Sequence, residues 1–254
     1  MRASAMGAAV VALALPLTSS GAAKPARTAS TAHQPGRCPA VRAPRHAPPD
    51  GSGVTVVVGA SIAEGYHTTG GERTAWPHLL GERLRHEDAP GTIVNDSVNA
   101  ARLLADTTGH PCTSALHRED QALAVPGVRT LVLTDLINDI QQTPHVHDPR
   151  TITDGLKAFV ARAHARGVRV VAGTISPYGG FVSYEPAGER TRRAVNDFIR
   201  HSGLFDGVID FDAIVADPGN PSRMRPAYDS GDHLHPNDAG QRAITQGIPL
   251  DVLQ

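Results

Sequence analysis

The 254-residue sequence contains few aromatic residues, few cysteines and little net charge. Phe, Trp and Tyr make up 4% of it, and basic and acidic residues nearly balance, giving a formal net charge of −1. Proteins that bind nucleic acids generally need a basic field or aromatic platforms on which bases stack. We therefore expect no nucleic-acid partner. With 40% hydrophobic residues, the chain is long enough for one globular domain with its own core.

The sequence also lacks a long hydrophobic run at its start. The Ala-rich stretch at residues 5–17 is shorter than the roughly 20 residues of a transmembrane helix. Arg2 precedes this stretch and small residues follow it up to Ala23, a pattern typical of a cleaved signal peptide. We therefore expect a signal peptide at residues 1–23, no stable membrane span, and secretion to the extracellular space. A disordered or anchored tail is the alternative.

Residues 24–52 are rich in Pro, Ala, Arg, His and Gly and show no apolar periodicity. This composition predicts a disordered linker before a folded, monomeric domain at residues 53–254. The two cysteines, Cys38 and Cys112, lie in the linker and in the domain. In an oxidising compartment an even number of cysteines suggests a disulfide, although two free thiols remain possible because sequence does not show proximity.

Short β-branched runs alternate with amphipathic helical stretches along the domain. This alternation predicts a parallel sheet with helices on both faces, where ligands bind beyond the carboxyl ends of the strands. The expected strands lie at residues 54–58, 92–94, 130–133, 168–172 and 207–210, and the expected helices at residues 76–86, 151–166, 187–201 and 237–248.

Polar residues follow three of the expected strands. Ser61 comes just after the first expected strand and Gly59, at the expected start of a helix. A serine in that position is placed like a nucleophile, since the N–H groups of the helix N-terminus surround its oxygen. A plain helix cap is the alternative. Polar loops that begin at residues 95 and 135 follow the second and third strands.

The segment YDSGDHLHPNDAG at residues 228–240 concentrates polar residues near the end of the chain. It is compatible with a metal site, a solvated loop or the acid and base of a catalytic site. The two histidines lack further metal ligands at a convincing spacing. A second cluster of His145, His147 and Asp148 is flanked by prolines, and we expect it to be a solvated loop. We therefore expect no metal site and no cofactor.

Four segments, in this order, resemble the motif blocks of the SGNH hydrolases, the esterase and lipase superfamily also called GDSL. The first contains the serine, the second resembles N-x-G-x-x-G-N-R-L, the third G-x-N-D, and the last D-x-x-H-P. The resemblance extends from about residue 54 to the C-terminus. The four segments are VVVGASIAEG, NDSVNAARLL, LINDI and DHLHPNDAG.

The resemblance implies a three-layer αβα sandwich, flavodoxin-like, with a central parallel sheet of about five strands. It also implies a secreted hydrolase of carboxylic esters that needs no cofactor and acts on a small-molecule, lipid or acetylated ester. In this sequence Ser61 matches the nucleophile, and Asp232 and His235 match the rest of the triad. The D-x-x-H spacing lets Asp232 reach Nδ1 of His235 while Nε2 faces the serine, and His233 would point elsewhere.

The same resemblance implies an oxyanion hole formed by the backbone N–H groups of Ser61 and Ala100 and the side-chain amide of Asn138. Several positions depart from the motifs: Ala60 replaces the usual Asp, Ser97 and Ala100 replace glycines, Ala101 replaces an Asn, and Leu136 replaces a Gly.

These departures lead to two expectations. Ala100 keeps its N–H, although its Cβ disfavours a positive φ. Leu136 would add bulk beside the oxyanion hole, so that short acyl groups fit better than long ones. The alternative to an active esterase is a catalytically weakened protein with the SGNH fold that binds a surface polymer or lipid.

Overall fold

The computed structural model describes residues 38, 40–43, 46, 48 and 51–254. The predicted signal peptide and most of the predicted linker lie outside the described residues, so both remain predictions. Among the residues that are described, no helix is both long and apolar enough to cross a membrane.

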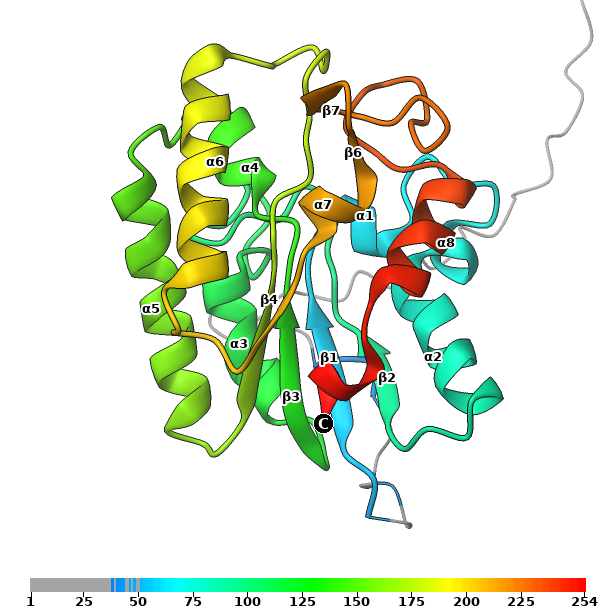
Figure 1. Ribbon diagram of the computed structural model, residues 1–254. Helices are drawn as coiled ribbons and strands as arrows, with labels where there is room; N and C mark the ends of the chain where they lie inside the picture. The colour runs from blue at the N-terminus through cyan, green and yellow to red at the C-terminus, as the bar shows by residue number, and fades with distance from the viewer. Residues whose placement is uncertain (1–37, 39, 44–45, 47, 49–50) are drawn as a thin grey trace, which may run out of the picture. The chain divides into compact units, whose positions relative to one another are not determined.

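A five-stranded parallel sheet forms the centre of the domain (Figure 1). Its strand order is β2-β1-β3-β4-β5, the doubly wound order. In this order, successive strands are added on one side of β1 and then, from β3 onward, on its other side. All five expected strands are present, within two residues of the predicted bounds. They are β1 (Val54–Val58), β2 (Thr92–Asn95), β3 (Val128–Leu133), β4 (Arg169–Gly173) and β5 (Gly207–Ile209).

Alternate side chains of the central strands enter two separate hydrophobic clusters, because successive residues of a strand point to opposite faces. In β1, Val56 and Val58 belong to one cluster and Val57 to the other. Both faces are therefore buried, which explains why these strands are continuous apolar runs rather than alternating ones.

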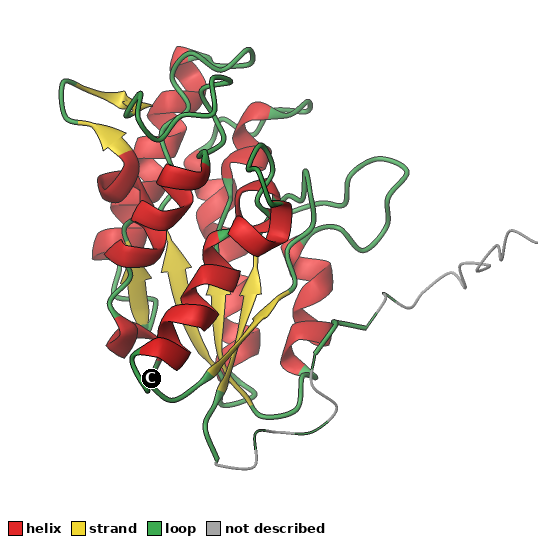
Figure 2. Cartoon of the chain, turned by 90° about the vertical axis from the view of Figure 1, so that its right-hand side faces the viewer, coloured by secondary structure: helices red, strands yellow, loops and turns green. Residues whose placement is uncertain are grey.

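Helices cover both faces of the sheet (Figure 2) and confirm the predicted three-layer αβα architecture. One cluster is closed by α3 (Ala115–Leu123), α5 (Pro149–His164) and α6 (Pro186–His201), and the other by α2 (Trp76–His86) and α8 (Asp238–Gly247). Of these, α3 was not predicted, whereas the other four lie within three residues of the expected ranges.

The strands point to a common edge, at the top of Figure 1, where short elements and loops gather. The C-terminus lies at the opposite edge, where the carbonyl of Leu253 accepts a hydrogen bond of 3.1 Å from Thr130 Oγ1 near the start of β3. The short elements at the first edge are α1 (Ser61–Glu64), η1 (Gly71–Thr74), α4 (Ile137–Gln141), α7 (Phe211–Val215) and the hairpin of β6 (Ala216–Asp217) and β7 (Asn220–Met224). The last short element, η2 (Leu250–Leu253), lies with the C-terminus at the opposite edge.

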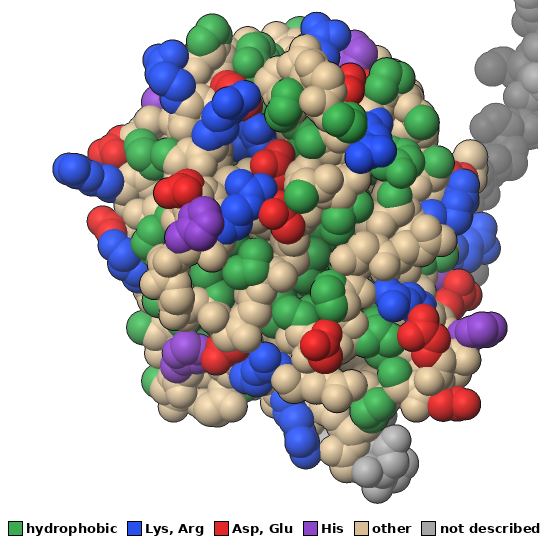
Figure 3. All heavy atoms as spheres, in the orientation of Figure 1, with side chains coloured by type: hydrophobic (Ala, Val, Ile, Leu, Met, Phe, Trp, Pro, Cys, Tyr) green, Lys and Arg blue, Asp and Glu red, His purple; other side chains and the backbone are tan. Residues whose placement is uncertain are grey.

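Cys38 and Cys112 form the predicted disulfide, with an S–S distance of 2.03 Å. The described residues that follow Cys38 have no regular secondary structure, but Val41 and Ala43 pack against the hydrophobic cluster on the α3 side. This part of the predicted linker is therefore held against the domain. Figure 3 shows acidic and basic side chains interspersed on the face that Figure 1 presents.

Candidate active site

Ser61 begins α1, directly beyond the carboxyl end of β1. The residue is 8% exposed, and its Oγ lies 2.9 Å from Nε2 of His235. The turn that leads to it is tight: a Cβ on Gly59 would lie 2.8 Å from the side chain of Thr134 at the end of β3. The structure thus brings the predicted nucleophile and the predicted base, 174 residues apart, into hydrogen-bond distance.

Asp232 and His235 lie in the loop between β7 and α8. Nδ1 of His235 lies 2.5 Å from Oδ2 of Asp232, and the other carboxylate oxygen accepts the backbone N–H groups of Leu234 and His235 at 3.0 and 2.9 Å. Because the carboxylate can only accept, Nδ1 carries the proton and Nε2 of the neutral ring is free to accept the hydroxyl proton of Ser61.

The hydrogen bonds also fix the charge of Asp232. Burial raises the pKa of this carboxyl, but hydrogen bonds from the backbone N–H and the ring of His235, together with that of Leu234, outweigh burial and lower the pKa to about 2. The carboxylate is therefore ionised at neutral pH and stabilises a positive charge on the His235 ring.

His233 forms a second pair with a carboxylate. Its Nδ1 lies 2.6 Å from Oδ2 of Asp229, and its backbone N–H donates to Oδ1 at 3.0 Å. The ring packs over Gly180, where an added Cβ would lie 3.0 Å from the imidazole. Ser61, the predicted nucleophile, is hydrogen-bonded to His235 and not to this ring.

Ala100 adopts the left-handed conformation, with φ of 59°. The sequence left open whether the loop needs a positive φ, and the structure shows that it does. A residue with a Cβ in this region costs roughly 1–2 kcal/mol. The turn is held by the N–H of Ala101, which donates to Val98 O at 3.0 Å, so the strain is borne by the surrounding structure.

Asn138, on α4, is oriented through both ends of its side-chain amide. Its Nδ2 donates to the carbonyl of Ala101 at 2.8 Å, and its Oδ1 accepts from Nε2 of Gln141 at 2.8 Å. Gln141 is held in turn by the hydroxyl of Ser183, at 2.7 Å. The first of these bonds joins the amide to the turn of Ala100, and the second hydrogen on Nδ2 remains available for a substrate oxygen.

Leu136 does not lie where the sequence suggested. Its side chain is 2% exposed and belongs to the hydrophobic cluster on the α3 side. The expectation that it adds bulk beside the oxyanion hole was therefore wrong, because its carbons fill the core. A preference for short acyl groups cannot rest on this residue.

Asp135 is a residue of the site that the motifs did not single out. It follows β3, has φ of 60°, and its Oδ2 accepts the N–H groups of Ala60 and Ala63 at 2.8 and 2.9 Å. Burial raises the pKa of this carboxyl, and the two N–H bonds oppose the rise. Asp135 thus holds the backbone on both sides of Ser61. A polar residue directly after a buried strand was the one signal that could have identified it.

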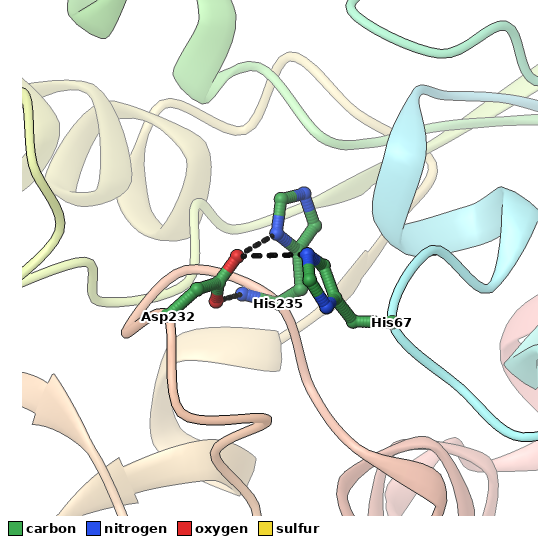
Figure 4. Close-up of side chains that lie close together, drawn as sticks. All are labelled: His67, Asp232 and His235. Carbon is green, nitrogen blue, oxygen red and sulfur yellow. Dashed lines mark hydrogen bonds and ion pairs between the residues drawn. The ribbon is translucent and has the colours of Figure 1, made fainter.

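His67 and Tyr66, from the loop after α1, adjoin the predicted triad. Nε2 of His67 lies 3.6 Å from Oδ2 of Asp232 (Figure 4), and the Tyr66 ring meets the ring of His235 edge-on at 4.8 Å between centroids. Sequence reasoning missed both residues, because nothing in the loop sequence indicates that it folds back onto a segment 165 residues away.

Among the described residues, the one cluster of three potential metal ligands consists of His67, Asp232 and His235, whose ligand atoms lie within 4.8 Å of one another. In the structure, Asp232 and His235 are already hydrogen-bonded to each other, so a metal on His235 Nδ1 would displace the bond that orients the predicted base. In the other predicted cluster, Asp148 caps α5 by accepting the N–H of Arg150 at 3.0 Å.

Left-handed residues other than glycine gather around the site. Six described residues of this kind have positive φ, and four of them belong to the segments just described: His67, Ala100, Asp135 and His233. Backbone strain of this kind concentrates at functional sites, where the surrounding structure holds it. The observation is an indication of function that does not depend on motif recognition.

The comparisons with known proteins agree with the fold. The model of the GDSL-like lipase/acylhydrolase family matches residues 57–243. A search of curated protein sequences found no match.

Solved structures with the same fold are similar over most of this chain. A GDSL-like lipase from Bacteroides thetaiotaomicron has a TM-score of 0.61 at 13% identity, over 81% of this chain and 90% of its own. The psychrotrophic esterase EstA from Pseudoalteromonas has a TM-score of 0.56 at 19% identity, over 76% of this chain and 93% of its own. The carbohydrate acetylesterase Est24 from Sinorhizobium meliloti has a TM-score of 0.59 at 12% identity, over 76% of this chain and 94% of its own. At these identities the likeness concerns the fold alone.

Proposed function

The chain belongs to the GDSL-like lipase/acylhydrolase family, and on that premise we propose that it is a secreted serine esterase that hydrolyses carboxylic esters. The observation that carries the proposal is the line of hydrogen bonds from Asp232 through His235 to Ser61, at 2.5 and 2.9 Å. A carboxylate that orients an imidazole, and an imidazole in contact with a hydroxyl, are what nucleophilic attack by a serine requires.

In the proposed reaction, Nε2 of His235 takes the proton of Ser61 while Oγ attacks the ester carbonyl. The imidazolium that forms is stabilised by the Asp232 carboxylate. His235 then returns the proton to the alcohol oxygen, the C–O bond breaks, and an acyl-serine remains. Water attacks this acyl group by the same route and releases the carboxylic acid.

The negative charge on the carbonyl oxygen would be held by three donors: the N–H groups of Ser61 and Ala100 and the Nδ2 of Asn138. Such donors act mainly in the transition state, where the charge develops. The left-handed turn at Ala100 and the bond from Asn138 to Ala101 support this assignment, because they fix the two donors outside α1 relative to each other.

A fluorophosphonate probe, which reacts with activated serines, tests the proposal directly. A phosphonate suits this fold, since monoethylphosphonate inhibits the similar Pseudoalteromonas esterase. We expect labelling of the native protein, no labelling of Ser61→Ala, and unchanged labelling of a control variant, Ser202→Ala, at an exposed serine after α6. Mass spectrometry of the labelled peptide locates the adduct.

Hydrolysis of p-nitrophenyl acetate provides the second measurement. Ser61→Ala should reduce kcat by roughly 10⁴-fold or more. A folded native protein that neither takes the label nor cleaves the ester would contradict the esterase proposal and would support the alternative of a binding protein with this fold.

Secretion is supported by the disulfide Cys38–Cys112, because such bonds persist in oxidising compartments. Expression of the full-length chain in a secreting host tests it. The mature protein should appear in the medium with an N-terminus near residue 24, whereas an intact N-terminus inside the cell would contradict export.

A further inference from the structure

A cavity of about 630 Å³ lies beside the triad, and the proposed reaction as described above does not use it. Four segments line the cavity: residues 40–42 ahead of β1, residues 64–72 from the last residue of α1 onward, residues 95–97 from the last residue of β2 onward, and Arg118 of α3. The first of these segments precedes the predicted domain. One wall of the cavity is therefore formed by residues that lie outside the segments resembling the family motifs.

Two lining residues connect the cavity with the catalytic base. Tyr66 contacts the ring of His235 at 4.8 Å between centroids, and His67 lies 3.6 Å from the Asp232 carboxylate. In ester hydrolysis the alcohol receives its proton from Nε2 of this histidine as it leaves. The alcohol therefore departs from beside the His235 ring, which Tyr66 of the cavity lining contacts.

The side chains that line the cavity are almost all polar. Only Ala40, Gly65 and Gly71 among the lining residues lack a polar side-chain atom. The charged groups of Arg42 and Glu72 make no hydrogen bond or ion pair with the described residues, and Tyr66, 47% exposed, offers both an aromatic face and a hydroxyl.

This lining discriminates between two kinds of alcohol. A fatty alcohol would remove water from the charged groups and give back no hydrogen bond, which is unfavourable. An alcohol with several hydroxyl groups can satisfy donors and acceptors at once, and its C–H face can pack on the tyrosine ring. We propose that the cavity binds the alcohol part of the ester, and that this part is a polyhydroxylated group of the sugar class.

The disulfide gives one wall of the cavity its position. Ala40 and Arg42 follow Cys38 closely, and Cys38 is bonded to Cys112 ahead of α3. Arg118, on the adjoining wall, is paired with Asp96 and lies 3.4 Å from the carbonyl of Cys112. The two walls are thus tied to the same cross-link, and Arg42 is the charged group that the tied segment adds to the cavity.

The proposal rests on the esterase function, and a matched pair of substrates tests it. 6-O-acetylglucose and hexyl acetate carry the same acyl group on a primary alcohol with the same number of carbons, and differ in hydroxylation. The native protein should favour the sugar ester at least tenfold in kcat/KM. A preference for hexyl acetate would overturn the proposal.

Substitutions of the lining residues test whether the cavity causes the preference for the sugar ester. Arg42→Ala and Glu72→Ala should each lower the ratio of kcat/KM for the two esters by fivefold or more. The matched controls are Arg85→Ala and Glu82→Ala, exposed on α2 and outside the cavity, which should keep the ratio within twofold of the native value. An unchanged ratio in both cavity variants would contradict the proposal even if the sugar ester were favoured.

A binding measurement separates failure of the cavity from failure of the esterase. Calorimetric titration of Ser61→Ala with 6-O-acetylglucose requires no turnover. Binding should weaken at least fivefold when Arg42→Ala and Glu72→Ala are added, and equal binding would overturn the cavity assignment. If the native protein cleaves no ester and takes no phosphonate label, the esterase proposal is wrong. The titration then still shows whether the cavity binds the sugar ester.

Discussion

Two histidine–aspartate pairs, whose histidines are two residues apart, lie in the same loop, and only one of them contacts the proposed nucleophile, Ser61. In both pairs the carboxylate binds the imidazole Nδ1 through one oxygen and the backbone N–H of the same histidine through the other. The His235 side chain is 8% exposed and the His233 side chain 43%. The hydrogen bond to a carboxylate therefore does not distinguish the proposed catalytic histidine, His235, from His233. Burial and contact with Ser61 do.

The largest expected effect comes from removing each imidazole in turn. His235→Ala should lower kcat for p-nitrophenyl acetate by roughly 10³-fold or more, because the serine loses its base. His233→Ala should change kcat by less than about threefold, as expected for a group that does not contact the reacting atoms. Similar losses in the two variants would show that the assignment of roles is wrong.

Substitution of the two aspartates should give the same contrast in kcat as substitution of the two histidines, with a smaller loss. Asp232→Asn should lower kcat by roughly 10²-fold, because an amide can donate to Nδ1 and so favours the wrong tautomer of His235. Asp229→Asn provides the matched control and should leave kcat within about threefold. Circular dichroism spectra of both variants check that the loop remains folded.

Asp135 allows a test of how the position of Ser61, the proposed nucleophile, affects kcat. Asp135→Ala leaves the N–H groups of Ala60 and Ala63 without their acceptor, so Ser61 should lose its alignment with His235, and kcat should fall about 10- to 100-fold. Asp135→Asn keeps one acceptor oxygen and should recover part of the loss while KM stays near the native value. Equal kcat in the alanine variant and the native protein would rule out a positioning role.

The smallest effect concerns stability and pH. The folded-state pKa of Asp232 is lowered from 3.8 to about 2, so its ionised form stabilises the fold above pH 4, and this contribution disappears as the pH falls to about 2. After allowance for partial exposure, it amounts to about 1–2 kcal/mol. In urea titrations, the stability difference between the native protein and Asp232→Asn should shrink between pH 5 and pH 2. A difference independent of pH would contradict the lowered pKa.

The sequence predicted the elements whose apolar residues are regularly spaced. All five strands of the sheet and four long helices follow from that spacing. The helix α3 was missed because its buried positions are only Ala115, Glu119, Ala122 and Leu123, which give a weak periodic signal. The hairpin of β6 and β7 is mostly polar and partly exposed, so it has no hydrophobic pattern to detect.

The candidate site was predicted where it coincides with motif blocks, and not where it depends on long-range contacts. Ser61, Asp232 and His235 each occupy a motif position, and the structure places them in contact. Asp135 and His67 act on residues far from them in sequence, and no local pattern encodes those contacts. Leu136 was misjudged because a motif position does not reveal whether a side chain points to the cleft or to the core.

The position of the C-terminus has a practical consequence for attaching the protein to a solid support. Leu253 is hydrogen-bonded to Thr130 near the start of β3, at the edge of the sheet opposite the proposed triad. A linker fused after Gln254 should therefore anchor the domain with the proposed active site toward the solution. Beads coupled through this end should retain more turnover per molecule than beads coupled at random through surface carboxylates, some of which line the cavity beside His235.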